Sequence, residues 1–196
     1  ADGIVIKIND QRLYNALGFI GKDARGAIAY KYPGEIIETQ LLEIQNNVGR
    51  TGVITPLAIL NPVLIGGVVV KQATLHNFDF IADKDIRIGD KVLLKRAGEV
   101  IPYIVASLPE KRDGNQAVYQ PPSTCPSCET RLVKDTEAVA WYCENVNCPA
   151  QLNRTIENYA SRTAMDIAGL GEKIVVKLTE AGLLKSIADL YILQKD

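Results

Sequence analysis

The chain begins with two short segments in which bulky apolar residues alternate with small or polar ones, a pattern typical of β-strands with two different faces. Residues 3–8 place isoleucines on one face and Lys7 on the other, beside glycine and valine. Residues 27–32 place isoleucine and tyrosines on one face, and Lys31 shares the other face with alanines. The small neighbours of Lys31 leave room for a flat or phosphorylated ligand. Alternation alone does not make a site, however, and ordinary solvated strand positions also explain both lysines.

The middle of the chain, from Thr39 to about Ser107, has the pattern of several short strands separated by turn signals. The candidate strands are Leu41–Val48, Val53–Leu60, Val68–Leu75, Lys91–Arg96 and Val100–Ala106. Residues 77–84 can form a helical turn capped by Asn77, and Ala97-Gly98 can form a tight turn before the last strand. Five strands with this short helix between the third and fourth predict a small closed barrel of the oligonucleotide-binding (OB) type.

Basic residues on the strands and turns of this barrel are suited to contact nucleic-acid backbone phosphates. The candidates are Arg50, Lys71, Lys95 and Arg96. Dispersed solubilising charge explains them equally well. The single histidine, His76, follows a strand and has no identifiable cysteine or serine partner, so we assign it no catalytic role.

All four cysteines lie in one segment as two close pairs, spaced C-x2-C and C-x4-C. Two such pairs can bring four thiolates to one tetrahedral zinc ion, which predicts a structural zinc site. Its ligands would be Cys125, Cys128, Cys143 and Cys148. A redox pair, an iron–sulfur cluster and disulfides are the alternatives, but secreted disulfide scaffolds are cysteine-dense and iron–sulfur clusters usually have other spacings. A catalytic zinc would keep one position open, so four cysteines favour a structural metal.

The segment after the cysteines predicts helices. Residues 150–159 have a helical pattern, and a second helical segment is expected at 164–167. A third helix is expected at Glu172–Thr179, with apolar residues on one side. Those residues are Ile174, Val175 and Leu178.

A glycine turn precedes that third helix. Gly169 and Gly171 flank one leucine, and glycine tolerates the positive φ of a sharp turn. The first N–H groups of the following helix would then face solvent and could bind one phosphate without reading base sequence. A plain helical corner with a glycine cap is the alternative.

Charge and composition limit the function classes. Lys and Arg number 22 against 23 Asp and Glu, and the net charge of −1 gives no general attraction to nucleic acid or anionic membranes. No stretch approaches the roughly 20 apolar residues of a membrane span, and no signal-peptide pattern is present. We therefore expect a cytoplasmic protein without disulfides. Because the chain opens at Ala1 directly before a strand, we also expect it to be a fragment.

The order of these motifs resembles one family, the bacterial NAD-dependent DNA ligases, over essentially all 196 residues. The segments that carry the resemblance are DGIVIKIN, AIAYKYP, VGRTGVITPLAILNPV, ATLHN, IRIGDKVLLKRAGEVIP, the cysteine segment and SRTAMDIAGLGEKI. The resemblance implies a multidomain α+β chain. Its parts would be the end of an adenylation (nucleotidyltransferase) domain at 1–34, an OB-fold domain at 35–118, a four-cysteine zinc finger at 119–150 and the start of a helix-hairpin-helix domain at 151–196.

By motif position, the resemblance implies that Lys7 and Lys31 contact the NAD cofactor, later the adenylate, and neutralise phosphate charge. It also implies that the four cysteines bind structural Zn²⁺ and that Mg²⁺ or Mn²⁺ supports catalysis. Asp2 matches a position where related transferases place an acidic residue near the metal. The implied partner is nicked double-stranded DNA, in replication and repair, with no membrane association, and we expect a monomer.

The family joins DNA strands in three phosphoryl transfers. A lysine in a Lys-x-Asp-Gly motif takes AMP from NAD, the AMP passes to the 5′-phosphate of a nick, and the 3′-hydroxyl then displaces it. Such chemistry needs positive charge aimed at the transferring phosphate. The resemblance places the nucleophilic lysine upstream of this chain, so no catalytic residue is assigned here, and we expect the isolated chain to be inactive in self-adenylation.

Two positions depart from the family pattern. Gly26 stands where a tryptophan is usual, which could loosen packing beside Lys31, and Asn158 stands where a histidine is common. Two other classes of function stay open at this point. One is a non-catalytic, zinc-containing nucleic-acid-binding adaptor, and the other is a zinc-stapled scaffold for protein–protein contacts.

Overall fold

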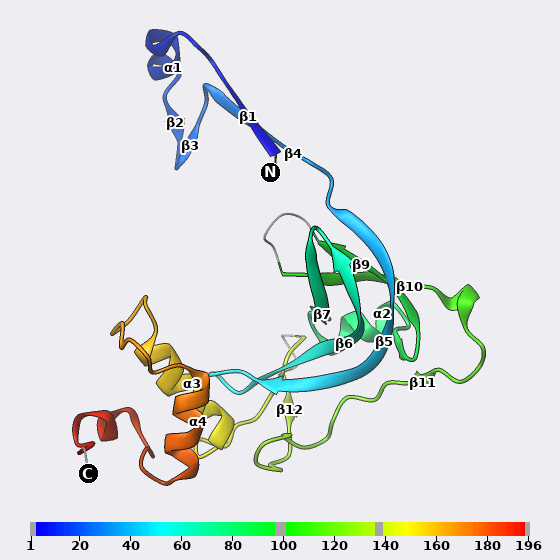
Figure 1. Cartoon of the computed structure of the whole chain (residues 1–196), viewed down its shortest axis with the longest axis vertical. Helices are drawn as coiled ribbons and strands as arrows, with labels where there is room; N and C mark the ends of the chain where they lie inside the picture. Colours follow the sequence, from blue (N-terminus) through cyan, green and yellow to red (C-terminus); the bar gives the residue numbers. More distant parts are fainter. Residues whose placement is uncertain (1–2, 97–100, 136–138, 195–196) are drawn as a thin grey trace.

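A computed structural model gives the fold of residues 3–96, 101–135 and 139–194. In Figure 1 the described chain forms an N-terminal ribbon, a β-barrel joined to the cysteine segment, and a C-terminal group of helices. Within these residues, no helix is both long enough and apolar enough to cross a membrane.

The N-terminal ribbon is made by the two segments whose alternation predicted strands. Its elements are β1 (Gly3–Lys7), α1 (Gln11–Leu17), β2 (Phe19–Ile20), β3 (Asp23–Ala24) and β4 (Ala27–Lys31). β1 and β4 pair antiparallel, and β2 and β3 form a small hairpin between them. The alternation did not predict α1. Asp10 caps this helix by accepting the N–H groups of Arg12 at 2.8 Å and Leu13 at 3.1 Å.

Five strands close into the barrel. In sheet order they are β6 (Val53–Ile65), β5 (Glu35–Val48), β9 (Lys91–Arg96), β10 (Tyr103–Ser107) and β7 (Val68–Thr74), and β7 pairs back onto β6. Four of these pairings are antiparallel, and β10 lies parallel to β7. The pairing of β6 with β7 closes the ring, which confirms the predicted five-stranded barrel.

The strand ends differ from the sequence prediction by several residues at three places. β6 ends at Ile65 instead of Leu60. β5 begins at Glu35 instead of Leu41, because residues 35–40 pair with β9 before the strand bends to pair with β6. β10 begins at Tyr103 instead of Val100. Val100 and the Ala97-Gly98 turn lie outside the described residues.

The predicted helix between the third and fourth barrel strands is present as α2 (Phe78–Asp83). Asn77 caps it as predicted, since its side-chain oxygen accepts the N–H of Phe80 at 2.7 Å. Phe78 and Ile81 are buried in the barrel core. The helix therefore plugs one end of the barrel.

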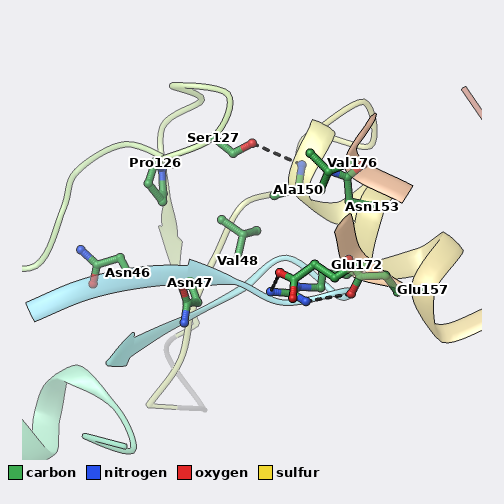
Figure 2. A pocket seen from close by; sticks show the side chains of 11 residues that line it. Asn46, Asn47, Val48, Pro126, Ser127, Ala150, Asn153, Glu157, Glu172 and Val176 are labelled. Carbon is green, nitrogen blue, oxygen red and sulfur yellow. Dashed lines mark hydrogen bonds and ion pairs between the residues drawn. The ribbon is translucent and has the colours of Figure 1, made fainter. Parts of the chain in front are cut away.

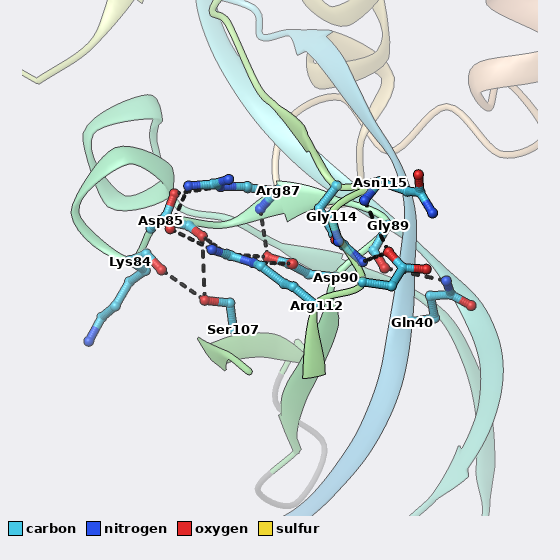
Figure 3. Close-up of polar contacts among 12 residues, drawn as sticks. Gln40, Lys84, Asp85, Arg87, Gly89, Asp90, Ser107, Arg112, Gly114 and Asn115 are labelled. Carbon is cyan, nitrogen blue, oxygen red and sulfur yellow. Dashed lines mark hydrogen bonds and ion pairs between the residues drawn. The ribbon is translucent and has the colours of Figure 1, made fainter. Parts of the chain in front are cut away.

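An ion-pair network around the buried Asp90 fixes the linker, residues 109–122, that leaves the barrel (Figure 3). The short elements around it are β8 (Arg87–Ile88), η1 (Pro109–Lys111) and β11 (Ala117–Val118), which pairs with β8. Asp90 is fully buried, and Arg112 of the linker donates to its carboxylate at 2.7 and 2.8 Å. The same guanidinium donates to Asp85 at 2.6 Å. Pairing offsets the cost of burying the Asp90 charge, so the network holds the linker against the barrel.

The cysteine segment contributes β12 (Val133–Lys134) and β13 (Trp141–Tyr142), and the C-terminal part contributes α3 (Pro149–Ala160), α4 (Glu172–Glu180) and η2 (Ile187–Tyr191). The helices share a small core of their own around Ile156, Val175 and Leu184. Val175 is buried and Leu178 packs against this core, but Ile174 is 44% exposed, so the predicted apolar side of α4 is only partly buried.

The helical segment predicted at 164–167 is wrong, because these residues form turns. The N–H groups of Met165 and Ile167 donate to the carbonyls of Tyr159 and Ala160, which are free at the end of α3. Asp166 has φ +48°, in the left-handed region. The segment therefore caps α3 instead of starting a new helix.

We expect Arg112→Ala to lower the free energy of unfolding by about 3 to 5 kcal/mol, because it leaves the Asp90 carboxylate buried without its cation. Urea unfolding followed by circular dichroism measures the change. Arg162→Ala, at an exposed position, is the control and should stay within about 0.5 kcal/mol of wild type. Equal stability of the two variants would contradict an anchoring role for the network.

Hydrogen bonds from Arg87 and Arg112 lower the pKa of Asp85 from 3.8 to about 2. Because the folded-state pKa lies below the unfolded one, the ionised carboxylate adds stability above pH 3.8, and this is lost as the pH falls towards 2. We expect the stability difference between wild type and Asp85→Asn to be constant near neutral pH, to shrink as the pH falls below 3.8 and to level off only below pH 2. Urea unfolding across a pH series measures it, and a difference independent of pH would refute the linkage.

Candidate metal centre and nucleic-acid interface

The four cysteine sulfurs converge on one point. All four Sγ atoms lie within 4.8 Å of one another. Cys125 and Cys148 are 3.9 Å apart, and Cys128 and Cys143 are 3.5 Å apart. Each contact joins one cysteine of the first pair to one of the second, and every thiol is free. The set is therefore arranged as a four-thiol site and not as two disulfides.

Tight turns aim both pairs at this point. In the first, the N–H of Cys125 donates to Thr130 at 2.8 Å, and the N–H of Glu129 donates back to Cys125 at 2.9 Å. In the second, the N–H of Cys148 donates to Asn145 at 3.0 Å, and Cys148 is the N-cap of α3. The rest of α3 then projects away from the thiols.

The thiols differ in how easily they lose a proton. Burial raises the pKa of Cys143 to about 12 and also raises the pKa of Cys125. Burial acts in the same direction on Cys128, but hydrogen bonding, in which the Thr130 hydroxyl lies 3.3 Å from Sγ, lowers its pKa to about 6. Metals bind thiolates, so an ion here must release the protons of the buried thiols.

The cysteine segment is part of the barrel, since β13 pairs antiparallel with the start of β6 and β12 pairs with β13. Trp141 of β13 meets Phe78 of α2 edge to face at 6.2 Å, and Tyr119 stacks on Phe78 at 6.1 Å. Tyr119 also donates its hydroxyl to Asn46 of β5 at 2.8 Å. Three of the cysteines lie in the same buried cluster as the barrel interior. The metal centre and the barrel thus share one core.

Lys7 and Lys31 lie on one face of the N-terminal ribbon, at its opposite ends. Lys7 pairs with Ala27, and Lys31 pairs with Gly3. Residues directly opposite in a sheet share a face, so the predicted small-residue face carries both lysines, about 13 Å apart along the strands. A Cβ atom at Gly3 would lie 2.3 Å from the Tyr30 carbonyl oxygen, so only glycine fits opposite Lys31.

The structure brings two of the predicted phosphate-binding residues together. Lys71 and Arg96 line one open groove with three valines of β7 and with Ile101. Arg96 is partly engaged there, because it donates to the carbonyls of Ile65 and Gly66 at 3.4 and 3.2 Å. Its guanidinium therefore supports the β6–β7 turn, which leaves Lys71 as the more exposed cation of this groove.

The other candidates lie apart from this groove. Lys95 pairs with Ile36 and Tyr103 on the opposite face of β9 from Arg96. Arg50 is exposed at the tip of the β5–β6 turn, beside the cysteine segment. The predicted sites therefore form separate basic points and not one continuous stripe.

The glycine turn lies on the far side of the cysteine segment. Gly169 has φ +85° as expected, whereas Gly171 has an ordinary negative φ and is the N-cap of α4. Glu172 occupies the first turn of α4 and pairs with Arg154 of α3 at 3.2 Å. This carboxylate competes with a phosphate for the helix N-terminus.

A hollow lies between the barrel, the cysteine segment and the C-terminal helices (Figure 2). It is lined by the end of β5, the first cysteine turn and the facing surfaces of α3 and α4. At its edge the N–H of Ala150 donates to the Ser127 hydroxyl at 3.2 Å. Arg154 donates to Glu157 at 2.7 Å and so lies between two carboxylates. The hollow marks where the helices meet the metal centre.

His76 has a local structural role. It has φ +58°, and its ring packs against Phe80 at 5.0 Å and Tyr103 at 5.9 Å. The backbone N–H of His76 donates to the Thr74 hydroxyl at 3.1 Å. These contacts position the chain before α2.

Known families match three parts of the chain. Residues 1–35 match the NAD-dependent DNA ligase adenylation domain, residues 38–116 the NAD-dependent DNA ligase OB-fold domain, and residues 124–150 the NAD-dependent DNA ligase C4 zinc finger domain. The chain belongs to the NAD-dependent DNA ligase family.

Proteins named DNA ligase match this ligase chain throughout. One from Roseiflexus sp. (strain RS-1) is 52% identical over 196 residues, which are 100% of this chain and 27% of the relative. Those from Syntrophomonas wolfei and Listeria monocytogenes are each 48% identical over 195 residues, covering 100% of this chain and 30% and 29% of the relatives. The chain thus spans less than a third of the length of these curated relatives.

The four thiols fit the zinc ion that the ligase C4 finger implies. Tetrahedral zinc with Zn–S distances of about 2.3 Å separates its sulfurs by about 3.8 Å. The two measured separations, 3.5 and 3.9 Å, bracket that value. Cys125, Cys128, Cys143 and Cys148 together would therefore hold a structural zinc ion in this ligase chain.

The glycine that departs from the ligase pattern has a packing partner. Gly26 is buried, and a Cβ atom there would lie 2.5 Å from the ring of Tyr14 in α1. The Tyr14 ring fills the space that a side chain at residue 26 would occupy. This contact compensates for the packing that Gly26 was expected to lose beside Lys31. Nothing in the structure explains Asn158.

One Lys-x-Asp-Gly spacing does occur in this chain, at residues 111–114. It lies in the linker, where Lys111 forms an ion pair with Glu38. Asp113 accepts the N–H of Asn115 at 3.0 Å, which lowers its pKa. The spacing belongs to a linker turn outside the adenylation match at residues 1–35.

Sequence reasoning also missed residues that connect the parts. Arg112 anchors the linker through Asp90, and Gly52 and Gln151 contact the backbone of Cys143. The glycine two residues after Arg50 was a signal for a turn with positive φ. No local signal linked it to a cysteine about ninety residues away.

We expect purified ligase chain to contain about one zinc ion per molecule, and Cys143→Ala to lose it. Elemental analysis measures the metal. Because metal centre and barrel share one core, chelation should also expose Trp141, the single tryptophan, and shift its fluorescence to longer wavelength. Re-addition of zinc is the control and should restore the signal. A metal-free protein with unchanged fluorescence after chelation would refute the assignment.

Proposed function

We propose that this chain is part of an enzyme that seals nicks in duplex DNA by joining a 3′-hydroxyl to a 5′-phosphate, through enzyme-AMP and DNA-adenylate intermediates, with NAD as the AMP donor. The observation that carries the proposal is the occurrence of three segments of one ligase family, in order, on one chain. The proposed division is 1–34, 35–118, 119–150 and 151–196, the last being the start of a helix-hairpin-helix domain.

Lys7 and Lys31 are the proposed cofactor-binding residues. They share one exposed face of the ribbon with glycine and alanine neighbours, so a nucleotide could approach the backbone closely. Two ammonium groups there would neutralise phosphate charge as the bond to AMP forms and breaks. The nucleophilic lysine would come from another part of the full-length enzyme, and bound Mg²⁺ or Mn²⁺ would add further positive charge.

The barrel, zinc finger and helices are the proposed DNA-binding surfaces. Arg50, Lys71, Lys95 and Arg96 would contact backbone phosphates from separate points, which suits a protein that wraps a duplex. The turn at Gly169 and Gly171 between α3 and α4 supports a helix-hairpin-helix unit, although Glu172 would weaken phosphate binding there. We further propose a monomeric cytoplasmic enzyme that acts in replication and repair.

Assays of the full-length enzyme with NAD, magnesium and nicked duplex test the proposal. We expect Lys7→Ala and Lys31→Ala each to slow AMP transfer by about 100-fold, because each removes a cation aimed at the transferring phosphate. Gel separation of the labelled enzyme-AMP and DNA-adenylate measures each step.

Lys22→Ala, in the exposed turn between β2 and β3, is the matched control and should keep wild-type rates. A full-length enzyme that never becomes adenylated would exclude ligation. If the chain still bound DNA with strong salt dependence in that case, the adaptor function would replace it.

A further inference from the structure

Gly52 ends the tight turn between β5 and β6 and is buried against a zinc ligand. Its carbonyl oxygen accepts the N–H of Cys143 at 2.9 Å. A Cβ atom on Gly52 would lie only 2.3 Å from the carbonyl oxygen of Cys143, and its φ of +81° also favours glycine. The barrel turn and the metal ligand therefore touch backbone to backbone, with no space between them.

Gln151 contacts the same cysteine through its carbonyl. From the first turn of α3, its side-chain amide donates to the carbonyls of Cys143 at 2.8 Å and Asn145 at 3.3 Å. The backbone of Cys143 is thus bound through its N–H to Gly52 and through its carbonyl to Gln151. The second cysteine turn has little freedom to move independently of the barrel.

The turn that Gly52 ends presents Arg50 to solvent. The N–H of Gly49 donates to Val53 at 2.8 Å, and the N–H of Gly52 donates to Gly49 at 3.0 Å. Arg50 and Thr51 are exposed at the tip. The two strand residues after the turn pair with β13, so the cysteine segment supports the turn through sheet pairing as well.

We infer that Gly52 and Gln151 are positioning residues, which transmit metal binding at Cys143 to the β5–β6 turn and so hold Arg50 in place for a DNA phosphate. The inference rests on the proposed function for the DNA contact but not for the coupling of metal and turn. With zinc bound, the sulfur of Cys143 would be held in place, its backbone would keep its hydrogen bond to Gly52, and the turn would stay ordered. An ordered turn loses less conformational entropy when Arg50 binds.

Hydrogen–deuterium exchange of the zinc-loaded chain tests the coupling without DNA. We expect the peptide that covers residues 48–54 to exchange at least about tenfold faster after chelation, because the turn opens locally. Gly52→Ala should produce the same fast exchange with zinc still bound. Elemental analysis confirms the metal content of each sample.

Gly67→Ala is the matched control, because Gly67 has a similar φ of +75° but nothing lies within 4 Å of a Cβ atom there. It has the same backbone strain without the contact and should leave the exchange of 48–54 unchanged. Gln151→Met removes only the amide donors and is the second test variant if Gly52→Ala does not fold. Equal exchange in Gly52→Ala, Gln151→Met and Gly67→Ala would overturn the inference.

A double-mutant cycle tests the link to DNA. We expect Arg50→Ala and Gly52→Ala each to weaken binding to nicked duplex by about tenfold and to lower the salt slope by about 1, as for one lost phosphate contact. The double variant should be no weaker than either single variant, since both remove one interaction. Additive losses would show that Gly52 acts independently of Arg50.

The DNA contact of Arg50 and the coupling between metal and turn can be refuted independently. If Arg50→Ala leaves DNA binding unchanged while chelation still frees the 48–54 turn, the DNA contact at this turn is wrong and the coupling stands. If chelation leaves the turn protected while Arg50→Ala weakens binding, the coupling is wrong and the DNA contact stands.

Discussion

The rest of the structure depends on four sulfur atoms crowded into a space that apolar side chains enclose. Buried thiols in mutual contact cannot all ionise without a cation, and the high pKa of Cys143 expresses that cost. A zinc ion held by these cysteines would remove the conflict by replacing the protons with one ion of higher charge. Because three of the cysteines belong to the barrel's buried cluster, the same ion would also stabilise the packing of residues far outside the cysteine segment.

In this chain, whose net charge is −1, many charged side chains are paired with one another inside the protein. Several cations serve internal contacts: Arg112 neutralises Asp90, Arg154 lies between two glutamates, and Arg96 supports a turn. Arg50, at the β5–β6 turn, and Lys71, on β7, are exposed and not used in these internal contacts.

Sequence patterns predicted most of the fold because the deciding signals are local. Alternation identified the strands of the ribbon and barrel, Asn77 marked the start of α2, and cysteine spacing identified the four thiols that converge on one point. The prediction at 164–167 was wrong because helix propensity does not show that the free carbonyls of α3 need donors, which Met165 and Ile167 supply. The site residues Gly52, Gln151 and Arg112 act through contacts between segments far apart in sequence, so no local pattern could identify them.

The pairing of β13 with β6 makes the barrel and the zinc finger one physical unit, although they follow each other as separate modules along the chain. A barrel shortened before the cysteine segment would leave the backbone of Val53 and Ile54 as an unprotected sheet edge. Such edges recruit strands from neighbouring molecules and promote aggregation. Any natural rearrangement that shuffles these modules must therefore transfer barrel and finger together.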